Sequence, residues 1–149
     1  MITRARLSRR GATVYDRLVR YLVAEGASLE CSCGNDRARL QLRPRPHHVD
    51  QKVIAHVEDH KALRDIPSFG MCNSMTNPDV AAKTAAAGTL TKAPCIPPKF
   101  TIWQPGAKWI MQVFEGRRIN ALTSDSKCTC SYAGIVKIVK PNTELKVND

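Results

Sequence analysis

The positions of six cysteines constrain this chain more than any other feature of its sequence. Two Cys-x-Cys pairs stand at the ends of the array and two single cysteines lie between them: Cys31 with Cys33, Cys72, Cys95, and Cys128 with Cys130. Thiolates on loops that are distant in sequence can converge on one metal ion or pair as disulfides. Within a strand, a Cys-x-Cys pair directs both sulfurs to the same face. Under either chemistry the cysteines hold the two ends of the domain together.

The remaining composition explains why such a crosslink is useful. The chain has 149 residues, enough for one domain, but only 5% of them are aromatic, with nine prolines and eight glycines. Its core must therefore be built mainly from Val, Ile, Leu and Ala. Small or thin cores commonly recruit a metal or disulfides to compensate for limited packing.

The choice between metal and disulfide depends on the redox compartment. No apolar run of the length of a membrane span is present, which predicts no such span. The best candidate for a signal segment, residues 18–24, is interrupted by Arg20 and preceded by Asp16 and Arg17, which argues against export by a cleaved leader. A reducing cytoplasm favours free or metal-bound thiols. We therefore predict metal binding rather than disulfides.

The net charge of +10 is unevenly distributed. Residues 1–20 hold six arginines against one acid, which predicts a basic N-terminal arm with Arg6, Arg9 and Arg10 as candidate partner contacts. Further along, four arginines alternate with other residues around Leu40 and Leu42, and this period of two predicts a solvated strand face: Arg37, Arg39, Arg43 and Arg45. Base-stacking aromatics are not interleaved with these arginines, which argues against binding of single-stranded nucleic acid.

Beyond the arm, the pattern predicts a strand-rich unit with one helix. Asn77 as N-cap, Pro78 at the first helical position and Gly88 at the C-terminus delimit an alanine-rich helix. Strand-like stretches enter Cys31 and cover residues 21–23, 39–42, 53–57, 109–114, 118–122 and 134–139. No strict internal repeat is visible.

No catalytic signature is complete. Residues 56–58 (His-Val-Glu) with Cys95 partly match the zinc deaminase pattern, but Pro98 occupies the position of the required second thiol. No Cys-x-x-Cys motif occurs, and nothing marks one cysteine as a nucleophile. His60 is either a further ligand near the cysteines or a turn residue. We therefore predict a protein that is not an enzyme.

The order of short motifs resembles the PAAR-like domains that were once catalogued only as a domain of unknown function. The matching pieces are YLVAEGASLECSCG (21–34), DH (59–60), IPSFGMC (66–72), NP (77–78), LTKAPCIP (90–97), Trp103, AL (121–122), SKCTC (126–130) and SYAGIVKIV (131–139). Tyr132 and Ala133 stand where the family tends to have Trp-Gly. The resemblance divides the chain into the arm (1–20), a PAAR-like domain (21–141) and a C-terminal tail (142–149).

The resemblance implies a mainly β fold: a small conical PAAR-like β-prism with one short Ala-rich helix and a basic N-terminal extension. It also implies a tip protein that caps a trimeric VgrG-like spike of a contractile injection apparatus of the type VI secretion kind, where it aids membrane puncture and effector attachment. Such a protein is assembled in the bacterial cytoplasm and then exported at the spike tip. The stretches 109–114 and 134–139 are expected at its base, and the arm is expected to hold an effector or adaptor.

The resemblance also implies a metal near the point of the tip. Four cysteines match the family most firmly and come from four separate segments, so we expect Cys31, Cys72, Cys95 and Cys130 as ligands. Cys33 and Cys128 are reserve ligands because each lies two residues from a primary one. Thiolates suit zinc, and iron is the main competitor. The alternative function is a cysteine-zinc nucleic-acid-binding module, which would use the same cysteines and the positive charge.

Overall fold

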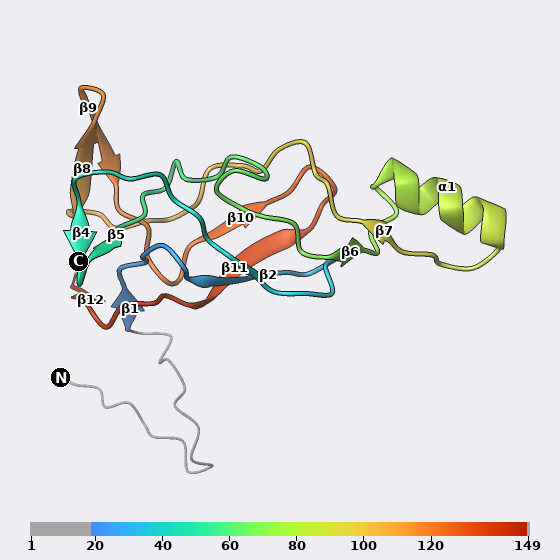
Figure 1. Cartoon of the computed structure of the whole chain (residues 1–149), viewed down its shortest axis with the longest axis horizontal. Helices are drawn as coiled ribbons and strands as arrows, with labels where there is room; N and C mark the ends of the chain where they lie inside the picture. Colours follow the sequence, from blue (N-terminus) through green and yellow to red (C-terminus); the bar gives the residue numbers. More distant parts are fainter. Residues whose placement is uncertain (1–18, 149) are drawn as a thin grey trace, which may run out of the picture.

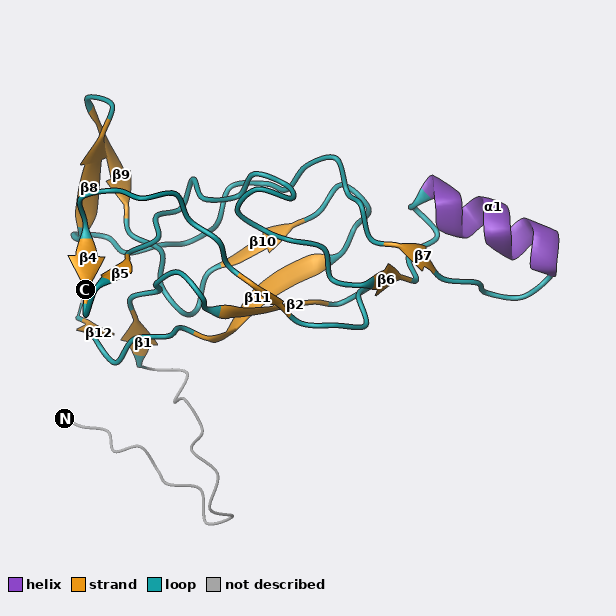
Figure 2. Ribbon diagram, viewed as in Figure 1, coloured by secondary structure: helices purple, strands orange, loops and turns teal. Residues whose placement is uncertain are grey.

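Short strands make up most of the regular structure, as the scattered prolines and glycines predict. The structure, a computed structural model, describes residues 19–148. Within them it contains twelve strands and one helix, drawn along an elongated body in Figures 1 and 2. The predicted mainly β fold with one short helix is confirmed. No helix in residues 19–148 is long and apolar enough to cross a bilayer.

The largest sheet runs along the body and has four antiparallel strands. In spatial order they are β10 (Lys127–Thr129), β11 (Ile135–Lys140), β2 (Ser28–Cys31) and β3 (Ala38–Arg39). Burial alternates along β11, where Val136 and Ile138 are buried and the residues on either side of Val136 are exposed. This alternation places one face of the sheet on the core and the other toward solvent.

Three two-stranded ribbons gather at one end of the body (Figure 1). They pair β1 (Arg20–Tyr21) with β12 (Lys146–Val147), β5 (Lys52–Val53) with β4 (His48–Val49), and β9 (Arg117–Asn120) with β8 (Met111–Phe114). All three ribbons are antiparallel. We call this end the base. Because β1 and β12 pair here, the described chain both enters and leaves the body at the base.

A closed ring of backbone hydrogen bonds joins the three ribbons. The N–H of Val23 donates to the carbonyl of Leu122 at 3.3 Å, that of Leu122 to the carbonyl of Ala55 at 3.0 Å, and that of Ala55 to the carbonyl of Val23 at 2.8 Å. Each ring residue lies two positions after the end of β1, β5 or β9, and all three are fully buried. The three segments are therefore related by an approximate threefold pattern.

The same pattern recurs one step outward. Each ring residue is preceded by a residue whose N–H donates to a carbonyl in the second segment of the same ribbon. These bonds run from Leu22 to Leu145 at 2.9 Å, from Ile54 to His47 at 3.0 Å, and from Ala121 to Ile110 at 2.9 Å. Those three acceptors immediately precede β12, β4 and β8. The base thus repeats one arrangement of backbone three times, although the three sequences share no visible repeat.

The opposite end carries the helix. β6 (Met71–Cys72) pairs with β7 (Ala93–Pro94), and α1 (Pro78–Ala87) projects from this pair, as Figure 1 shows. The predicted caps are confirmed: the Asn77 side chain accepts the N–H of Asp79, and Gly88 adopts a left-handed conformation with φ of 78°. Val80 is the only buried residue of α1. Packing against the body therefore contributes little to this helix.

One apolar cluster fills the body between the two ends. Its largest fully buried side chains include Trp103, Phe69, Leu29 and Ile66, and five of the six cysteines are buried within it. The thiols thus supply part of the core that the low aromatic content leaves unfilled.

Candidate functional site

The chain brings all six cysteines into one region away from the base. Val136 of β11 is the cross-strand partner of both Cys128 in β10 and Cys31 in β2. Gly34 forms an isolated bridge with Cys72, which links the first Cys-x-Cys segment to β6. Cys95 follows β7, the partner of β6, and donates its N–H to the carbonyl of Gly70 at 2.8 Å.

Cys31 and Cys130 are in direct side-chain contact. The hydrogen bond from the Cys31 thiol lowers the pKa of Cys130 to about 6, and the same contact raises the pKa of Cys31. The sulfur of Cys130 also accepts the N–H groups of Tyr132 at 3.3 Å and Gly134 at 3.4 Å. These three donors stabilise the thiolate form of Cys130.

Gly134 leaves the space that this thiol pair occupies. A Cβ at this position would lie 2.6 Å from the sulfur of Cys31 and 3.3 Å from that of Cys130. Any side chain here would therefore push the two sulfurs apart. Glycine is required here because the two sulfurs approach its Cα closely. Its backbone conformation does not require glycine, since its φ is not in the left-handed region.

Cys128 and Cys95 are less readily ionised. Burial raises the pKa of Cys128 to about 12. Burial also raises the pKa of Cys95, with smaller contributions from the charges of Cys72 and Cys130. The sulfur of Cys72 accepts the N–H of Ser74 at 3.4 Å, and Cys33 is half-buried. All six are free thiols.

The predicted ligands fit a thiophilic metal by their chemistry and their grouping. Soft sulfur donors from four segments are the set that zinc or iron prefers. Charges on Cys72 and on Cys130 would both raise the pKa of Cys95, which indicates that both residues lie near Cys95. However, no three His, Cys, Asp or Glu side chains within residues 19–148 are arranged as a ready ligand set. The six thiols lie in one region, but their sulfur atoms do not converge on a single position that an ion could occupy.

His60 lies near this thiol cluster. Its Nδ1 is 3.0 Å from the carbonyl oxygen of Phe100, and Phe100 forms an isolated bridge with Cys130. His60 and Cys130 also line the same shallow cavity of about 320 Å³. Because the Phe100 carbonyl can only accept, Nδ1 is the donor in this contact.

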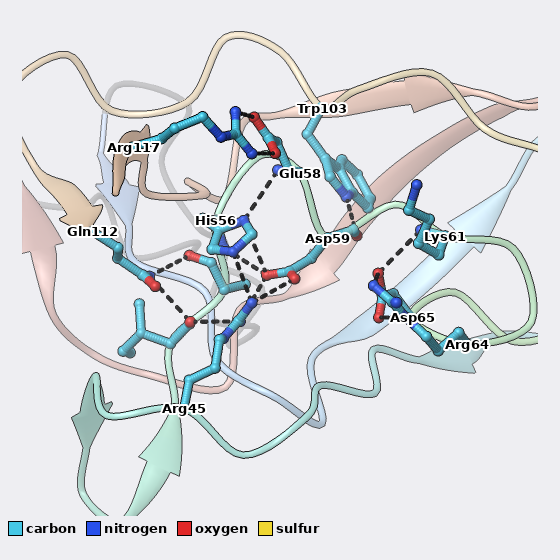
Figure 3. Close-up of polar contacts among 12 residues, drawn as sticks. Arg45, His56, Glu58, Asp59, Lys61, Arg64, Asp65, Trp103, Gln112 and Arg117 are labelled. Atoms are coloured by element: carbon cyan, nitrogen blue, oxygen red, sulfur yellow. Dashed lines mark hydrogen bonds and ion pairs between the residues drawn. The ribbon is translucent and has the colours of Figure 1, made fainter. Parts of the chain in front are cut away.

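A second polar cluster, which the sequence did not reveal, surrounds Arg45 and Asp59 (Figure 3). Arg45 makes a bidentate ion pair with Asp59, at 2.7 and 2.8 Å, and both side chains are more than nine-tenths buried. The prediction that Arg45 lies on a solvated strand face is wrong. Pro44 and Pro46 flank this arginine and interrupt the regular strand on which the alternation rule depends.

This ion pair braces the ring at the base. Arg45 Nη2 donates to the carbonyl of Ile54 at 3.0 Å, and the side-chain amide of Gln112 in β8 donates to the carbonyls of Ile54 and Ala55 at 3.1 and 3.2 Å. On its other side, Asp59 presents its backbone carbonyl to the indole N–H of Trp103 at 2.8 Å. The pair therefore connects the ring to the core of the body.

His56 belongs to this cluster and not to a metal site. Its Nε2 lies 2.8 Å from Arg45 Nη1, and its Nδ1 accepts the N–H of Glu58 at 3.2 Å. Burial lowers the pKa of His56, and the Arg45 cation acts in the same direction. Glu58 pairs instead with Arg117 at 2.7 Å, on the surface. Both residues of the partial deaminase pattern are thus engaged in other contacts.

The base exposes apolar side chains on β8 and at Trp109, two residues before this strand. The exposed fractions are 77% for Trp109, 62% for Val113 and 41% for Met111. The predicted base stretch 109–114 lies here, whereas the stretch 134–139 forms β11 in the four-stranded sheet. The candidate partner contacts Arg6, Arg9 and Arg10 lie outside the described residues.

Comparison with known proteins identifies a family. The family described as "Domain of unknown function (DUF4280)" matches residues 23–142, most of the chain, and the chain belongs to it. No curated protein and no solved structure matches the chain. Strand pairing extends the folded body slightly beyond the matched range, to Arg20 and Val147.

Proposed function

We propose that this member of the DUF4280 family is a non-enzymatic tip protein that caps a trimeric, VgrG-like spike of a contractile injection apparatus. The observation that carries the proposal is the threefold pattern of backbone hydrogen bonds at the base. A single chain that sits on the axis of a homotrimer must offer three similar contacts, one to each subunit. Three ribbons around a closed ring meet this requirement.

The chemistry of the base supports the same role. The ribbons end in short strand edges, which a partner can extend by adding strands. β8 adds Met111 and Val113, and Trp109 lies just before this strand. Exposed apolar groups of this kind gather at protein interfaces. We further propose that the body is a conical prism that narrows from this base toward the thiol cluster.

Metal binding completes the proposal. Zinc, with iron as the competitor, would be held by Cys31, Cys72, Cys95 and Cys130, and Cys33 and Cys128 lie close enough to substitute. When bound, the ion would crosslink four segments of a body whose core is thin, and binding energy of this kind is folding energy. The narrow end of a puncturing device would gain rigidity that packing alone does not supply there.

The proposed life cycle follows from the spike role. The protein would assemble on the spike in the bacterial cytoplasm and leave the cell at the tip of the apparatus. Residues 1–20 would attach near the base, because the described chain begins beside β1 and β12, and would recruit an effector or adaptor.

Stoichiometry tests this proposal. The chain should co-purify with a VgrG-like trimer encoded near it in a ratio of one copy to three spike chains. The variant Val113→Glu places a charge on the base, and the matched control Ile135→Glu changes an apolar residue of similar exposure, 51%, on the four-stranded sheet. We expect the base variant to lose the complex and the control to keep it. A ratio of three to three, or equal loss in both variants, would refute the tip role.

A further inference from the structure

The solvent face of the four-stranded sheet is strongly basic. Its cations come from β3, β10, β11 and the turn before β3, and all are exposed: Arg37, Arg39, Lys127, Lys137 and Lys140. Glu30 in β2 is the only acidic side chain that projects from these four strands. We call these five cations together with Glu30 the basic sheet face.

Strand register sets like charges against each other on this face. Lys127 and Lys137 are direct cross-strand partners, an arrangement that costs stability. Glu30, the partner of Lys137 on the other side, lies 3.7 Å from Lys137 and 3.7 Å from Arg37, so one carboxylate is shared between two cations. The side chain of Lys127 has no hydrogen bond or ion pair within residues 19–148, and neither does that of Lys140 or Arg39. The fold therefore retains an unfavourable charge arrangement that an external anion would relieve.

An apolar residue lies among these cations. Ile135 is the cross-strand partner of Thr129, is 51% exposed, and lies two residues before Lys137 on the same face. No aromatic side chain projects from the exposed positions of the four strands, so the face lacks the stacking groups of a single-strand nucleic-acid platform. Cations around one exposed aliphatic side chain fit the headgroup region of a bilayer, where the charges meet phosphates and the apolar group enters the interface.

We propose that the basic sheet face binds the surface of a membrane rich in anionic phospholipids. The assignment to a membrane rests on charge complementarity, because Glu30 neutralises only one of the five positive charges on this face. A bilayer surface supplies phosphates without requiring a binding site of matching shape. The strands β10, β11 and β2 run along the flank of the body, so Lys127 and Lys137 stay open when the base is covered. Lys140 lies nearer the base, where it lines a hollow with Asp50 and Glu144. This inference is independent of the spike role, because it needs only the folded chain.

Vesicle binding of the full chain tests the proposal. Wild-type protein would be sedimented with vesicles of phosphatidylcholine alone and of phosphatidylcholine with one quarter phosphatidylglycerol. We expect binding only to the anionic vesicles, and weaker binding at 0.5 M salt than at 0.1 M. Because each lysine at such a surface is worth about fivefold in affinity, Lys127→Gln with Lys137→Gln should weaken binding by about 25-fold.

A matched control removes the same charge elsewhere. Lys83→Gln with Lys92→Gln takes two exposed lysines from the helical end, so the net charge and the N-terminal arm are the same in both double variants. The control should stay within about twofold of wild type. Equal loss in both double variants, or no binding of wild type to anionic vesicles, would overturn the proposal.

Two further measurements distinguish a lipid surface from nucleic acid as the ligand of the basic sheet face. Ile135→Ser should weaken vesicle binding without changing its dependence on salt, because it removes an apolar contact and no charge. Duplex DNA would be titrated with the same variants. If the sheet-face variant lost DNA binding but kept vesicle binding, nucleic acid would be the occupant and the proposal would be wrong. Circular dichroism of each variant checks that the fold is intact.

Discussion

The buried ion pair between Arg45 and Asp59 gives the sharpest test of how this fold is held together. The variant Asp59→Asn keeps the shape of the side chain and removes its charge. It leaves the Arg45 guanidinium, which is 8% exposed, without a counterion, and it disturbs the carboxylate oxygen that accepts the backbone N–H of His56 at 2.8 Å. Removing one partner of a buried pair costs about 3–5 kcal/mol.

That loss is large for a domain of this size. Domains are typically stable by about 5–15 kcal/mol, so a loss of about 3–5 kcal/mol is about a fifth of the total or more. Because the pair holds Ile54, next to the ring residue Ala55, and Trp103 of the core, the loss should appear as one cooperative transition and not as local fraying. Urea unfolding followed by tryptophan fluorescence measures the effect as a lower midpoint with an unchanged slope.

The neighbouring pair between Glu58 and Arg117 is the control. It has the same bidentate form, at 2.7 and 3.0 Å, but both side chains are partly or largely exposed. Exposed pairs contribute little, so Glu58→Gln should leave the midpoint almost unchanged. Replacing the buried pair by Asp59→Leu with Arg45→Met should recover most of the loss. Similar midpoints for Asp59→Asn and Glu58→Gln would refute the assignment of the buried pair as a brace.

Three other predictions address metal, pH and the arm. Cys95→Ser should release zinc or iron and lower stability by several kcal/mol, as loss of a structural metal does; metal analysis of protein purified without affinity metals decides this, and unchanged metal content would remove Cys95 from the site. Burial lowers the pKa of His56 in the folded protein, so its contribution to the free energy of unfolding should be fully present above the unfolded pKa near 6.5 and should decrease as the pH falls below that value. In urea titrations between pH 7 and 5, the free energy of unfolding of His56→Gln should therefore decrease less than that of the wild type. Changing Arg6, Arg9 and Arg10 together to Glu should abolish recruitment of an effector while leaving spike binding intact, and the wild-type association should weaken between about 0.1 and 0.5 M salt; full delivery by the triple variant would show that the arm is a solvated tail.

Local features of this protein could be read from its sequence because their causes are local. The helix begins at Asn77 and ends before Gly88 since a cap needs only a side-chain acceptor and a residue that tolerates positive φ. The alternation along β11 likewise predicts which residues are buried, because successive side chains point to opposite faces. The low aromatic content predicted a core built mainly from Val, Ile, Leu and Ala, and the buried residues confirm it.

Other features arise only when distant segments meet. The direct contact of Cys31 with Cys130 depends on Gly134, a residue whose importance lies in the two sulfurs beside it and not in its own conformation. Arg45 is buried because Asp59 lies opposite it, and no spacing rule connects a residue between two prolines with a carboxylate fourteen positions away.

The threefold pattern at the base is the clearest case. Val23, Ala55 and Leu122 occupy equivalent places in the ring, yet nothing in their flanking sequences is shared. Every residue except proline carries the same backbone N–H and C=O groups. Unrelated residues can therefore form the same hydrogen-bonded ring, provided that each ring position is apolar enough to be buried. The sequence alone predicted the helix and the longer strands β2, β8, β9 and β11, but it did not predict β4, β6, β7, β10 or β12. The tertiary structure decided that three of the strand pairs close into one ring, because only closure of the chain brings their N–H and carbonyl groups together.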